Sequence, residues 1–381
     1  MKIVFLMNSF DMGGAEKHAL SLADYYRNTL GWETEVWGWY EKSGRVKEVC
    51  EEIGVKTKLV PPFDKFRKKL YLLQLKSYAK LFKEAKVDVI MSFNNKPNIL
   101  SSAFFDKADV KLHVWAQQGI DAYVKVFQTK LEKKFLKNVT CVISNSYNGK
   151  RFLEQEHGMN PDSIKVVQNG IKVPKGITDK QVWESKVGIK KDEKHFSAAM
   201  IANLTYMKDH VTLVKAWKIV KDTLEPKGVT PLLYFAGRID VAGEEVLKLI
   251  QELGLIRNVF CLGAIKDVTG FINIIDLAIL SSPTEGVPNA VLESMILGKP
   301  FVGTDIDGIK EAVGEDNYQF LAPEKDAEAL ADKILQFASN PDLCEVIGKK
   351  NKEFVAERFK MDTLGTETHK IVLEELAKKG F

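Results

Sequence analysis

The stretch SSPTEGVPNAVLE (residues 281–293) decides how the fold is interpreted. It follows DLAIL (residues 276–280), a short apolar run ended by turn residues, which predicts a buried parallel strand. Small polar and turn-forming residues then lead into a helical run over residues 289–297. Strand, loop and helix in this order leave free backbone N–H groups where the helix begins, and the helix dipole favours an anion there.

Two carboxylates flank that junction, because Glu285 precedes the helical run and Glu293 lies within it. A carboxylate repels a phosphate group but accepts hydrogen bonds from sugar hydroxyls. The predicted ligand therefore carries both phosphate and hydroxyl groups, a combination that describes a sugar nucleotide.

Strand-like and helix-like segments alternate along the rest of the chain. The predicted strands lie at residues 2–8, 35–39, 87–91, 110–116, 139–143, 164–168, 196–202, 232–236, 259–262, 276–280 and 301–303. Repeated βα units argue for an α/β fold with doubly wound parallel sheets. A chain of 381 residues is too long for one ordinary core, so two domains are expected. Periodicity is lost over residues 171–194, after the turn Asn169-Gly170, and this segment is the predicted boundary.

The composition is that of a soluble globular protein, with 45% hydrophobic and 28% charged residues. No run approaches ~18 consecutive apolar residues, and the N-terminus lacks the pattern of a signal peptide. Four cysteines are scattered along the chain, which predicts reduced thiols, a cytoplasmic location and no zinc site.

The charge is distributed unevenly. Residues 1–170 carry 27 Lys and Arg against 19 Asp and Glu, whereas residues 171–381 carry 28 against 32. The net charges of these parts are +8 and −4, so the first half is expected to meet an anionic partner. Nucleic acid is not that partner, because the basic segment lacks the interleaved aromatics of a known binding module.

A helix predicted over residues 65–86 is the most basic element. Its two faces differ in character, with Tyr71, Leu75, Tyr78, Phe82 and Ala85 on one and Lys65, Lys69, Lys76, Lys80 and Lys83 on the other. One interpretation is electrostatic docking on an anionic membrane surface or a phosphorylated acceptor. The other is the solvated face of a helix packed on the core.

Two adjacent glycines, Gly13 and Gly14, occupy the turn between the first predicted strand and the following helix. Glycine there allows positive φ and close approach of the backbone to a ligand, as phosphate loops require. An ordinary βα turn is the simpler interpretation of this pair.

Four blocks resemble the retaining glycosyltransferases of family four, which have the GT-B fold. The blocks are GGAEKHALSLA (13–23), VVQNGI (166–171), LYFAGR (233–238) and EGVPNAVLESMILGKPFVGTDIDGIKE (285–311). The resemblance implies two Rossmann-like doubly wound parallel-sheet domains facing a central cleft. Residues 1–170 would form the acceptor-binding domain and residues 171–361 the donor-binding domain. The final helix, about residues 362–381, would pack back on the first domain.

The resemblance also assigns roles to residues. Glu293 would bind the ribose hydroxyls and Glu285 the hydroxyls of the transferred sugar. Lys208 would contact the diphosphate and, with Glu285, form the catalytic pair. The distal phosphate would be held by backbone N–H groups of one loop, formed by Gly286, Val287, Pro288 and Asn289. Gly13 and Gly14 would close over the phosphates from the other domain.

Asn203 departs from the family's pattern, because an arginine usually stands five residues before the lysine. One charge-assisted phosphate contact, worth ~1.5–3 kcal/mol, is then missing. Three outcomes are open: Arg238 compensates on the donor side, another cation does so, or the donor is bound weakly.

Two further departures concern the acceptor side and metal binding. Gln117 and Gln118, followed by Gly119, stand where many members have a histidine, so their predicted role is to orient an acceptor hydroxyl. His113, earlier on the strand, is expected to be packed. Asp307 replaces a usual glycine, which makes residues 305–307 look like a metal-binding D-x-D. No metal or other cofactor is expected, because the surrounding block is of the metal-independent type.

The predicted activity is retaining transfer of a sugar from a nucleotide-diphosphate sugar, a UDP-sugar in preference to a GDP-sugar. The acceptor is a glycan, a lipid-linked sugar or a polysaccharide, and the enzyme is peripheral at the inner face of the membrane. Cations at the departing oxygen stabilise the charge that grows there. Two alternatives stay open: a nucleotide-sugar epimerase of the same fold, and a non-catalytic glycan- or polyanion-binding relative.

Overall fold

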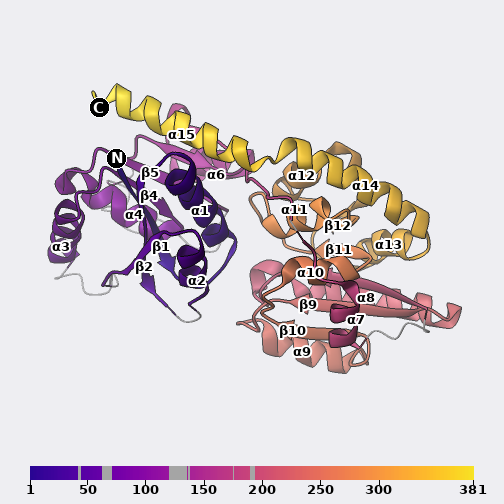
Figure 1. Cartoon of the computed structure of the whole chain (residues 1–381). Helices are drawn as coiled ribbons and strands as arrows, with labels where there is room; N and C mark the ends of the chain where they lie inside the picture. The colour runs from indigo at the N-terminus through magenta and orange to yellow at the C-terminus, as the bar shows by residue number, and fades with distance from the viewer. Residues whose placement is uncertain (42–43, 62–70, 120–134, 136–137, 175, 189–193) are drawn as a thin grey trace. The chain divides into compact units, whose positions relative to one another are not determined.

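The chain divides into two compact units (Figure 1). A computed structural model describes residues 1–381 except 42–43, 62–70, 120–134, 136–137, 175 and 189–193. The first unit comprises Met1–Gly170 and Met361–Phe381, and the second comprises Ile171–Lys360. Each unit contains its own parallel sheet, so the prediction of two doubly wound parallel-sheet domains is confirmed.

The first unit is built on a sheet of seven parallel strands within its described residues. These are β1 (Lys2–Ser9), β2 (Glu33–Tyr40), β3 (Lys56–Leu59), β4 (Val89–Phe93), β5 (Leu112–Gln117), β6 (Val142–Ser144) and β7 (Ile164–Val166). They lie in the order β3-β2-β1-β4-β5-β6-β7. The first six follow the strand order of a Rossmann sheet.

Helices cover both faces of this sheet. The longer ones are α1 (Gly14–Asp24), α2 (Arg45–Glu52), α3 (Tyr71–Glu84), α4 (Asn95–Phe104), α6 (Tyr147–His157) and α15 (Met361–Lys378). Successive residues of β1 point to opposite faces, so Phe5 packs with α1, α2 and α15, whereas Leu6 packs with α3 and α4. Burial on both faces explains why the strands are continuous apolar runs in the sequence.

The second unit repeats this plan with six parallel strands among its described residues. They are β8 (His195–Met200), β9 (Thr230–Ala236), β10 (Val259–Gly263), β11 (Leu277–Leu280), β12 (Phe301–Thr304) and β13 (Leu321–Ala322). Their order, β10-β9-β8-β11-β12-β13, is again that of a Rossmann sheet.

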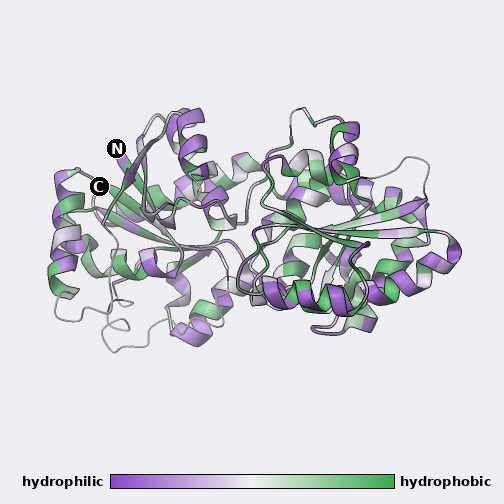
Figure 2. Ribbon diagram, turned by 90° about the horizontal axis from the view of Figure 1, so that it is seen from below, coloured by the Kyte–Doolittle hydropathy of each residue, from purple (hydrophilic) through white to green (hydrophobic). Residues whose placement is uncertain are grey.

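Helices and short helical turns connect these strands. They are α7 (Lys180–Val187), η5 (Tyr206–Lys208), α8 (His210–Leu224), η6 (Glu225–Lys227), α9 (Gly243–Glu252), α10 (Val268–Ile274), α11 (Asn289–Ile296), α12 (Asp307–Val313), η7 (Glu315–Phe320), α13 (Ala327–Ala338) and α14 (Pro341–Arg358). Hydrophobic residues alternate with hydrophilic ones along the helices of both units (Figure 2). This pattern lets each helix bury one side and expose the other.

The strand order places one switch point in each sheet. It lies between β1 and β4 in the first unit and between β8 and β11 in the second. Ligands of open α/β sheets bind outside the carboxyl ends of the strands at such points. The loop after β8 contains Lys208, and the loop after β11 contains Glu285, so the strand order brings these two loops to one place.

Residues 171–194, predicted to be an irregular boundary, contain the helix α7. The Asp179 carboxylate caps it by accepting a hydrogen bond from the Gln181 N–H at 2.9 Å. Trp183 is buried, and its indole N–H donates to Asp267 at 2.7 Å. The helix is only eight residues long, too short to show a clear period in the sequence.

The basic helix predicted over residues 65–86 is described from Tyr71 onward, as α3. Lys65, Lys69 and the Tyr71 side chain lie outside the described residues. Leu75, Tyr78 and Phe82 are buried against the sheet, and Lys76, Lys80 and Lys83 are exposed. The apolar face is therefore used by the core of the first unit. Among the described residues, no helix is both long and apolar enough to cross a bilayer.

The last helix provides a test of the packing in the first unit. Leu376 is buried in the core shared with α1 and β5, whereas Leu373 on the same helix keeps 45% of its surface exposed. Replacing Leu376 with alanine leaves a cavity, so we expect the free energy of unfolding to fall by about 2–5 kcal/mol. Urea denaturation measures this, with Leu373→Ala as the matched control at about 0.5 kcal/mol or less. Equal losses for both variants would contradict the described docking of α15.

Candidate functional site

Lys208 and Glu285 form an ion pair at the switch point of the second sheet. The Lys208 amino group donates a hydrogen bond to one carboxylate oxygen of Glu285. The Glu285 side chain keeps 12% of its surface exposed and the Lys208 side chain 29%. Because the pair is shielded from water, its attraction is stronger than that of a surface pair. The two residues predicted to be catalytic are thus in direct contact.

Ser281, the first residue after β11, holds the Lys208 loop. Its hydroxyl lies 3.1 Å from the carbonyl oxygen of Lys208 and 2.9 Å from that of Asp209, so its proton is shared between them. Asp209 has a positive φ of 47° and caps α8, because its carboxylate accepts from the N–H of Thr212 at 3.1 Å. These contacts fix the loop at Lys208 and Asp209, where it enters α8.

His210 begins α8 directly beside this loop. Its side chain is buried, and its ring packs edge-on against Phe235 with the centroids 4.9 Å apart. Burial, together with the nearby charge of Lys208, lowers the pKa of His210 to about 4. The imidazole is therefore neutral at pH 7 and adds no second positive charge behind the lysine.

Asn203 connects the loop after β8 to the loop after β9. Its side-chain oxygen accepts a hydrogen bond from the backbone N–H of Arg238 at 2.9 Å. The N–H of Leu204 donates to the carbonyl of Arg238 at 2.9 Å. The close approach requires glycine at Gly237, where an added Cβ would lie 2.0 Å from the Ala202 carbonyl oxygen. An arginine has no acceptor with which to replace Asn203.

The helix α11 begins in the same loop that carries Glu285. Gly286, Val287 and Pro288 of this loop are buried, and Pro288, the residue before α11, makes no side-chain capping hydrogen bond. Asn289 is the first residue of the helix, and Glu293 lies one turn later, inside the predicted helical run. Both residues are half-buried. A partial positive charge at the helix start therefore follows Glu285 in the chain.

The glycine loop of the first unit lies at its switch point, after β1. Gly13 precedes α1 with φ −145°, and neither Gly13 nor Gly14 has a positive φ. Gly13 therefore has the extended geometry that is usual for the residue before a helix, as in an ordinary βα turn. A Cβ at Gly13 would lie 2.7 Å from the Glu16 carboxylate. Glu16 in turn accepts from the Asn94 side chain after β4 at 3.2 Å.

The predicted acceptor-side residues lie at the carboxyl end of β5 in the first unit, where Gln117 is the last residue of the strand. The Gln117 side chain accepts from the Trp115 indole at 2.9 Å and donates to the Gly119 carbonyl, so it fixes the course of the loop. Gln118 and Gly119 are half-buried. Asn145, which sequence reasoning missed, donates through its side chain to the Gln118 carbonyl at 3.4 Å. Asn145 directly follows the strand β6, and this position could have indicated a residue at the carboxyl end of the sheet.

Two histidines of the first unit are structural. His113 is buried, and its Nε2 lies 2.7 Å from the Ser92 hydroxyl, which confirms the prediction that it is packed. His18 is also buried, and its Nδ1 lies 2.8 Å from the Asn169 side-chain oxygen. Burial lowers the pKa to about 3 for His113 and to about 4 for His18, so both are neutral at pH 7.

Asp305 of the D-x-D sequence lies in the loop after β12, and Asp307 is the first residue of α12. Asp305 and Asp307 are exposed, and the Asp305 carboxylate pairs with Lys310 at 2.5 Å. In the described part of the chain, no group of three or more His, Cys, Asp or Glu side chains is placed to hold a metal ion.

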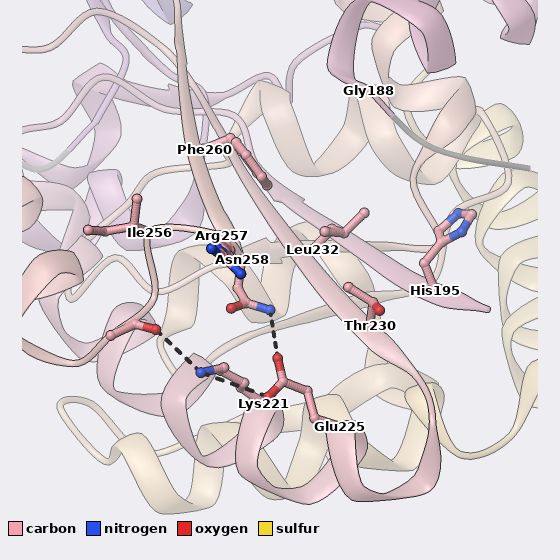
Figure 3. Close-up of a pocket in the computed structure, with 11 residues that line it drawn as sticks. Gly188, His195, Lys221, Glu225, Thr230, Leu232, Ile256, Arg257, Asn258 and Phe260 are labelled. Carbon is pink, nitrogen blue, oxygen red and sulfur yellow. Dashed lines mark hydrogen bonds and ion pairs between the residues drawn. The ribbon is translucent and has the colours of Figure 1, made fainter. Parts of the chain in front are cut away.

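A pocket of about 800 Å³ lies elsewhere in the second unit, at the amino ends of β8, β9 and β10 (Figure 3). His195, Thr230 and Asn258 are among the residues that line it. Its polar side chains bond to one another, because Asn258 donates to Glu225 at 3.3 Å and Lys221 pairs with Glu225 at 3.8 Å. This pocket lies at the amino ends of the strands, whereas Lys208 lies beyond their carboxyl ends. Ligands of open α/β sheets bind at the carboxyl ends, so we place the candidate site beside Lys208.

The fold is that of GT-B glycosyltransferases. The crystal structure of Anabaena HepE in complex with UDP and glucose matches with a TM-score of 0.83 at 20% identity and covers 98% of this chain and 100% of that one. Residues 12–174 match the family model Glycosyltransferase Family 4, and residues 181–354 match Glycosyl transferases group 1. The chain therefore belongs to these glycosyltransferases.

Curated relatives are distant. The putative glycosyltransferase EpsD of Bacillus subtilis is 28% identical over 191 residues, 49% of this chain and 47% of EpsD. The chain thus spans about half the length of that relative. An Escherichia coli UDP-Gal:alpha-D-GlcNAc-diphosphoundecaprenol alpha-1,3-galactosyltransferase is 23% identical over 293 residues, 74% of each chain.

The lowered pKa of His210 predicts a pH dependence of stability. Its unfolded pKa is about 6.5, so between pH 6.5 and 4 the unfolded chain binds one proton more than the folded chain. Stability is therefore lost as the pH falls, by up to about 1.4 kcal/mol per pH unit from this residue. Urea denaturation of the wild type and His210→Asn at pH 7.5, 5.5 and 4.5 measures the loss. We expect the variant to have the shallower slope, and identical slopes would contradict the buried neutral imidazole.

Proposed function

We propose that this protein is a retaining glycosyltransferase that moves a sugar from a UDP-sugar to a lipid-linked or glycan acceptor without a metal. The observation that carries the proposal is the contact between Lys208 and Glu285 at the switch point of the second sheet. A cation for the diphosphate and an acceptor for sugar hydroxyls are then next to each other. In a UDP-sugar the diphosphate is bonded directly to the transferred sugar. A lysine and a carboxylate side by side therefore suit both groups of the donor.

The ion pair suggests how the donor is bound. In the free protein Lys208 is neutralised by Glu285. A diphosphate carries more negative charge than one carboxylate, so it competes for the Lys208 amino group. Glu285 is then released to accept hydrogen bonds from the sugar. Lys208 remains at the oxygen where negative charge grows as the glycosidic bond breaks.

The relatives support the choice of donor and acceptor. The E. coli relative is named for a UDP-sugar donor and a diphosphoundecaprenol-linked acceptor, and HepE was crystallised with UDP and glucose. The alpha linkage in the name of the E. coli enzyme supports retention, because UDP-hexoses are commonly α-linked. A lipid-linked acceptor agrees with the excess of positive charge in the first unit.

Docking on an anionic membrane through α3 is part of the proposal. Leu72 and Leu73, at the first turn of α3, keep 63% and 60% of their surface exposed. Lys76 is exposed on the same helix. Lys80 pairs with Glu84 at 3.7 Å and Lys83 with Asp109 at 2.6 Å, so part of the charge on this helix is neutralised. The exposed leucines therefore have the larger share in the proposed docking.

Replacing Lys208 and Glu285 one at a time separates their roles. We expect Lys208→Met to lower kcat for sugar transfer by about 10²–10³-fold and to weaken UDP binding. We expect Glu285→Gln to lower kcat as well but to keep or increase UDP affinity, because Lys208 is freed. Product formation from a panel of UDP- and GDP-sugars and calorimetry with UDP measure both effects.

The matched control is Lys218→Met, which removes another lysine of an ion pair, with Asp222 on α8. It should leave kcat and UDP affinity unchanged. Loss of UDP binding in Glu285→Gln, or full activity in Lys208→Met, would contradict the proposed roles. The anomer formed in a single turnover, read by NMR, tests retention, and activity that EDTA abolishes would exclude the metal-free mechanism.

The membrane proposal predicts binding to vesicles of phosphatidylcholine with 30% phosphatidylglycerol. The double variant Leu72→Asp, Leu73→Asp should bind at least about fivefold less in co-sedimentation, because two apolar contacts are lost and two like charges added. The control is Leu247→Asp, which alters an exposed leucine of the second unit, on α9. Equal binding by all three proteins, or no binding by the wild type, would overturn this part of the proposal.

A further inference from the structure

We propose that the first turn of α12 holds the Glu285 loop in place and that Gly308, its second residue, is a positioning residue for the transfer reaction. The effect on catalysis rests on the proposed function, whereas the structural support does not. The relevant contact is between the loop after β11 and the start of α12, the helix that follows β12. The strands β11 and β12 pair in the second sheet.

The backbone of α12 closely approaches the backbone of the Glu285 loop at Gly308. This residue is buried at the start of α12. A Cβ added to Gly308 would lie 2.1 Å from the carbonyl oxygen of Gly286 and 2.3 Å from that of Glu285. Real Cβ atoms essentially never approach closer than 3.0 Å. Only glycine lets the α12 backbone touch the loop that carries Glu285.

The start of α12 is itself anchored on its far side. The N–H of Asp305 donates to the carbonyl of Ala322 in β13 at 2.7 Å. The Asp305 carboxylate pairs with Lys310 at 2.5 Å, and the Lys310 amino group lies 5.4 Å from the ring centroid of Tyr318 in η7. The residue that resembles half of a metal-binding D-x-D therefore has a structural partner. Through these bonds Asp305 connects the start of α12 to β13, the outer strand of the sheet.

This support matters most when the donor is bound. In the free protein, the Lys208 ion pair helps to hold the Glu285 side chain. In the proposed mechanism that pair opens when the diphosphate takes Lys208, so the backbone contact with Gly308 then has to keep Glu285 in position. A methyl group at residue 308 must push the loop away by about 1 Å, and such a displacement can lower the rate about 10²-fold.

Gly348 provides a matched control for the steric effect alone. On α14, a Cβ at Gly348 would lie 2.0 Å from the carbonyl oxygen of Gly298, nearly the same clash. Gly298 follows the carboxyl end of α11, away from Glu285 at the other end of that helix. Gly348→Ala therefore strains the same unit to a similar extent without touching the Glu285 loop.

The experiment compares Gly308→Ala and Gly348→Ala with the wild type. We expect Gly308→Ala to lower kcat by about 10²-fold. UDP affinity should fall by a smaller factor, because the displaced loop includes Gly286 but Lys208 is untouched. Gly348→Ala should keep kcat within about threefold at a similar loss of Tm. Hydrogen exchange of peptides that cover residues 281–290 should be faster in Gly308→Ala only.

Two measurements on the wild-type protein separate the proposed function from the proposed role of Gly308. They are kcat for sugar transfer and the hydrogen exchange of the peptides that cover residues 281–290. A wild type that transfers no sugar overturns the proposed function, whereas the exchange comparison still decides whether Gly308 supports the loop. Unchanged exchange in Gly308→Ala, or equal losses of kcat in both alanine variants, would overturn the positioning role. If Gly308→Ala does not fold, Asp305→Asn weakens the same anchor without a clash. Wild-type exchange over residues 281–290 in that variant would also overturn the proposal.

Discussion

The contact between a lysine and a carboxylate from two loops that are 77 residues apart organises the site of the second unit. It exists because the Rossmann strand order places β11 next to β8, although β9 and β10 lie between them in the sequence. Each partner is held from behind: the Lys208 loop by Ser281 and the Glu285 loop by Gly308. The Lys208 and Glu285 side chains are thus held in contact until another charged group competes for one of them.

An ion pair at the binding edge gives the site a simple electrostatic logic. Without a ligand, the two charges satisfy each other and neither is left alone in a partly buried place. A diphosphate replaces the carboxylate at the lysine, and the released carboxylate finds new partners in sugar hydroxyls. The neutral His210 adjoins this exchange without adding charge. Binding therefore replaces one satisfied arrangement with another.

Much of the fold could be predicted from local pattern. The apolar runs gave the strands β1, β8 and β11, because residues buried on both faces need no polar alternation. The loop that carries Glu285 was predicted from its turn residues and the helix that follows. The short helix α7 was missed, since eight residues with one buried tryptophan show no periodicity.

The details of the site depended on contacts between distant segments, which no local pattern contains. Asn203 was interpreted as a lost arginine, but its oxygen accepts from the backbone of Arg238. The bonds of the Gln117 amide to Trp115 and Gly119, on the predicted acceptor side, could not be found from the sequence either. The glycine pair at residues 13–14 left the backbone geometry open, and the structure gives Gly13 an extended conformation before α1. The role of Gly308 follows only from the coordinates of a neighbouring loop.

The central claim is that the Lys208–Glu285 pair opens to receive a diphosphate at the carboxyl edge of the second sheet. A crystal structure of the protein with UDP tests it most directly. The account predicts the distal phosphate within hydrogen-bond distance of the Lys208 amino group, Glu285 separated from Lys208, and Glu293 bonded to the ribose. UDP bound at the amino ends of β8–β10, or a Lys208–Glu285 pair left intact beside the nucleotide, would contradict it.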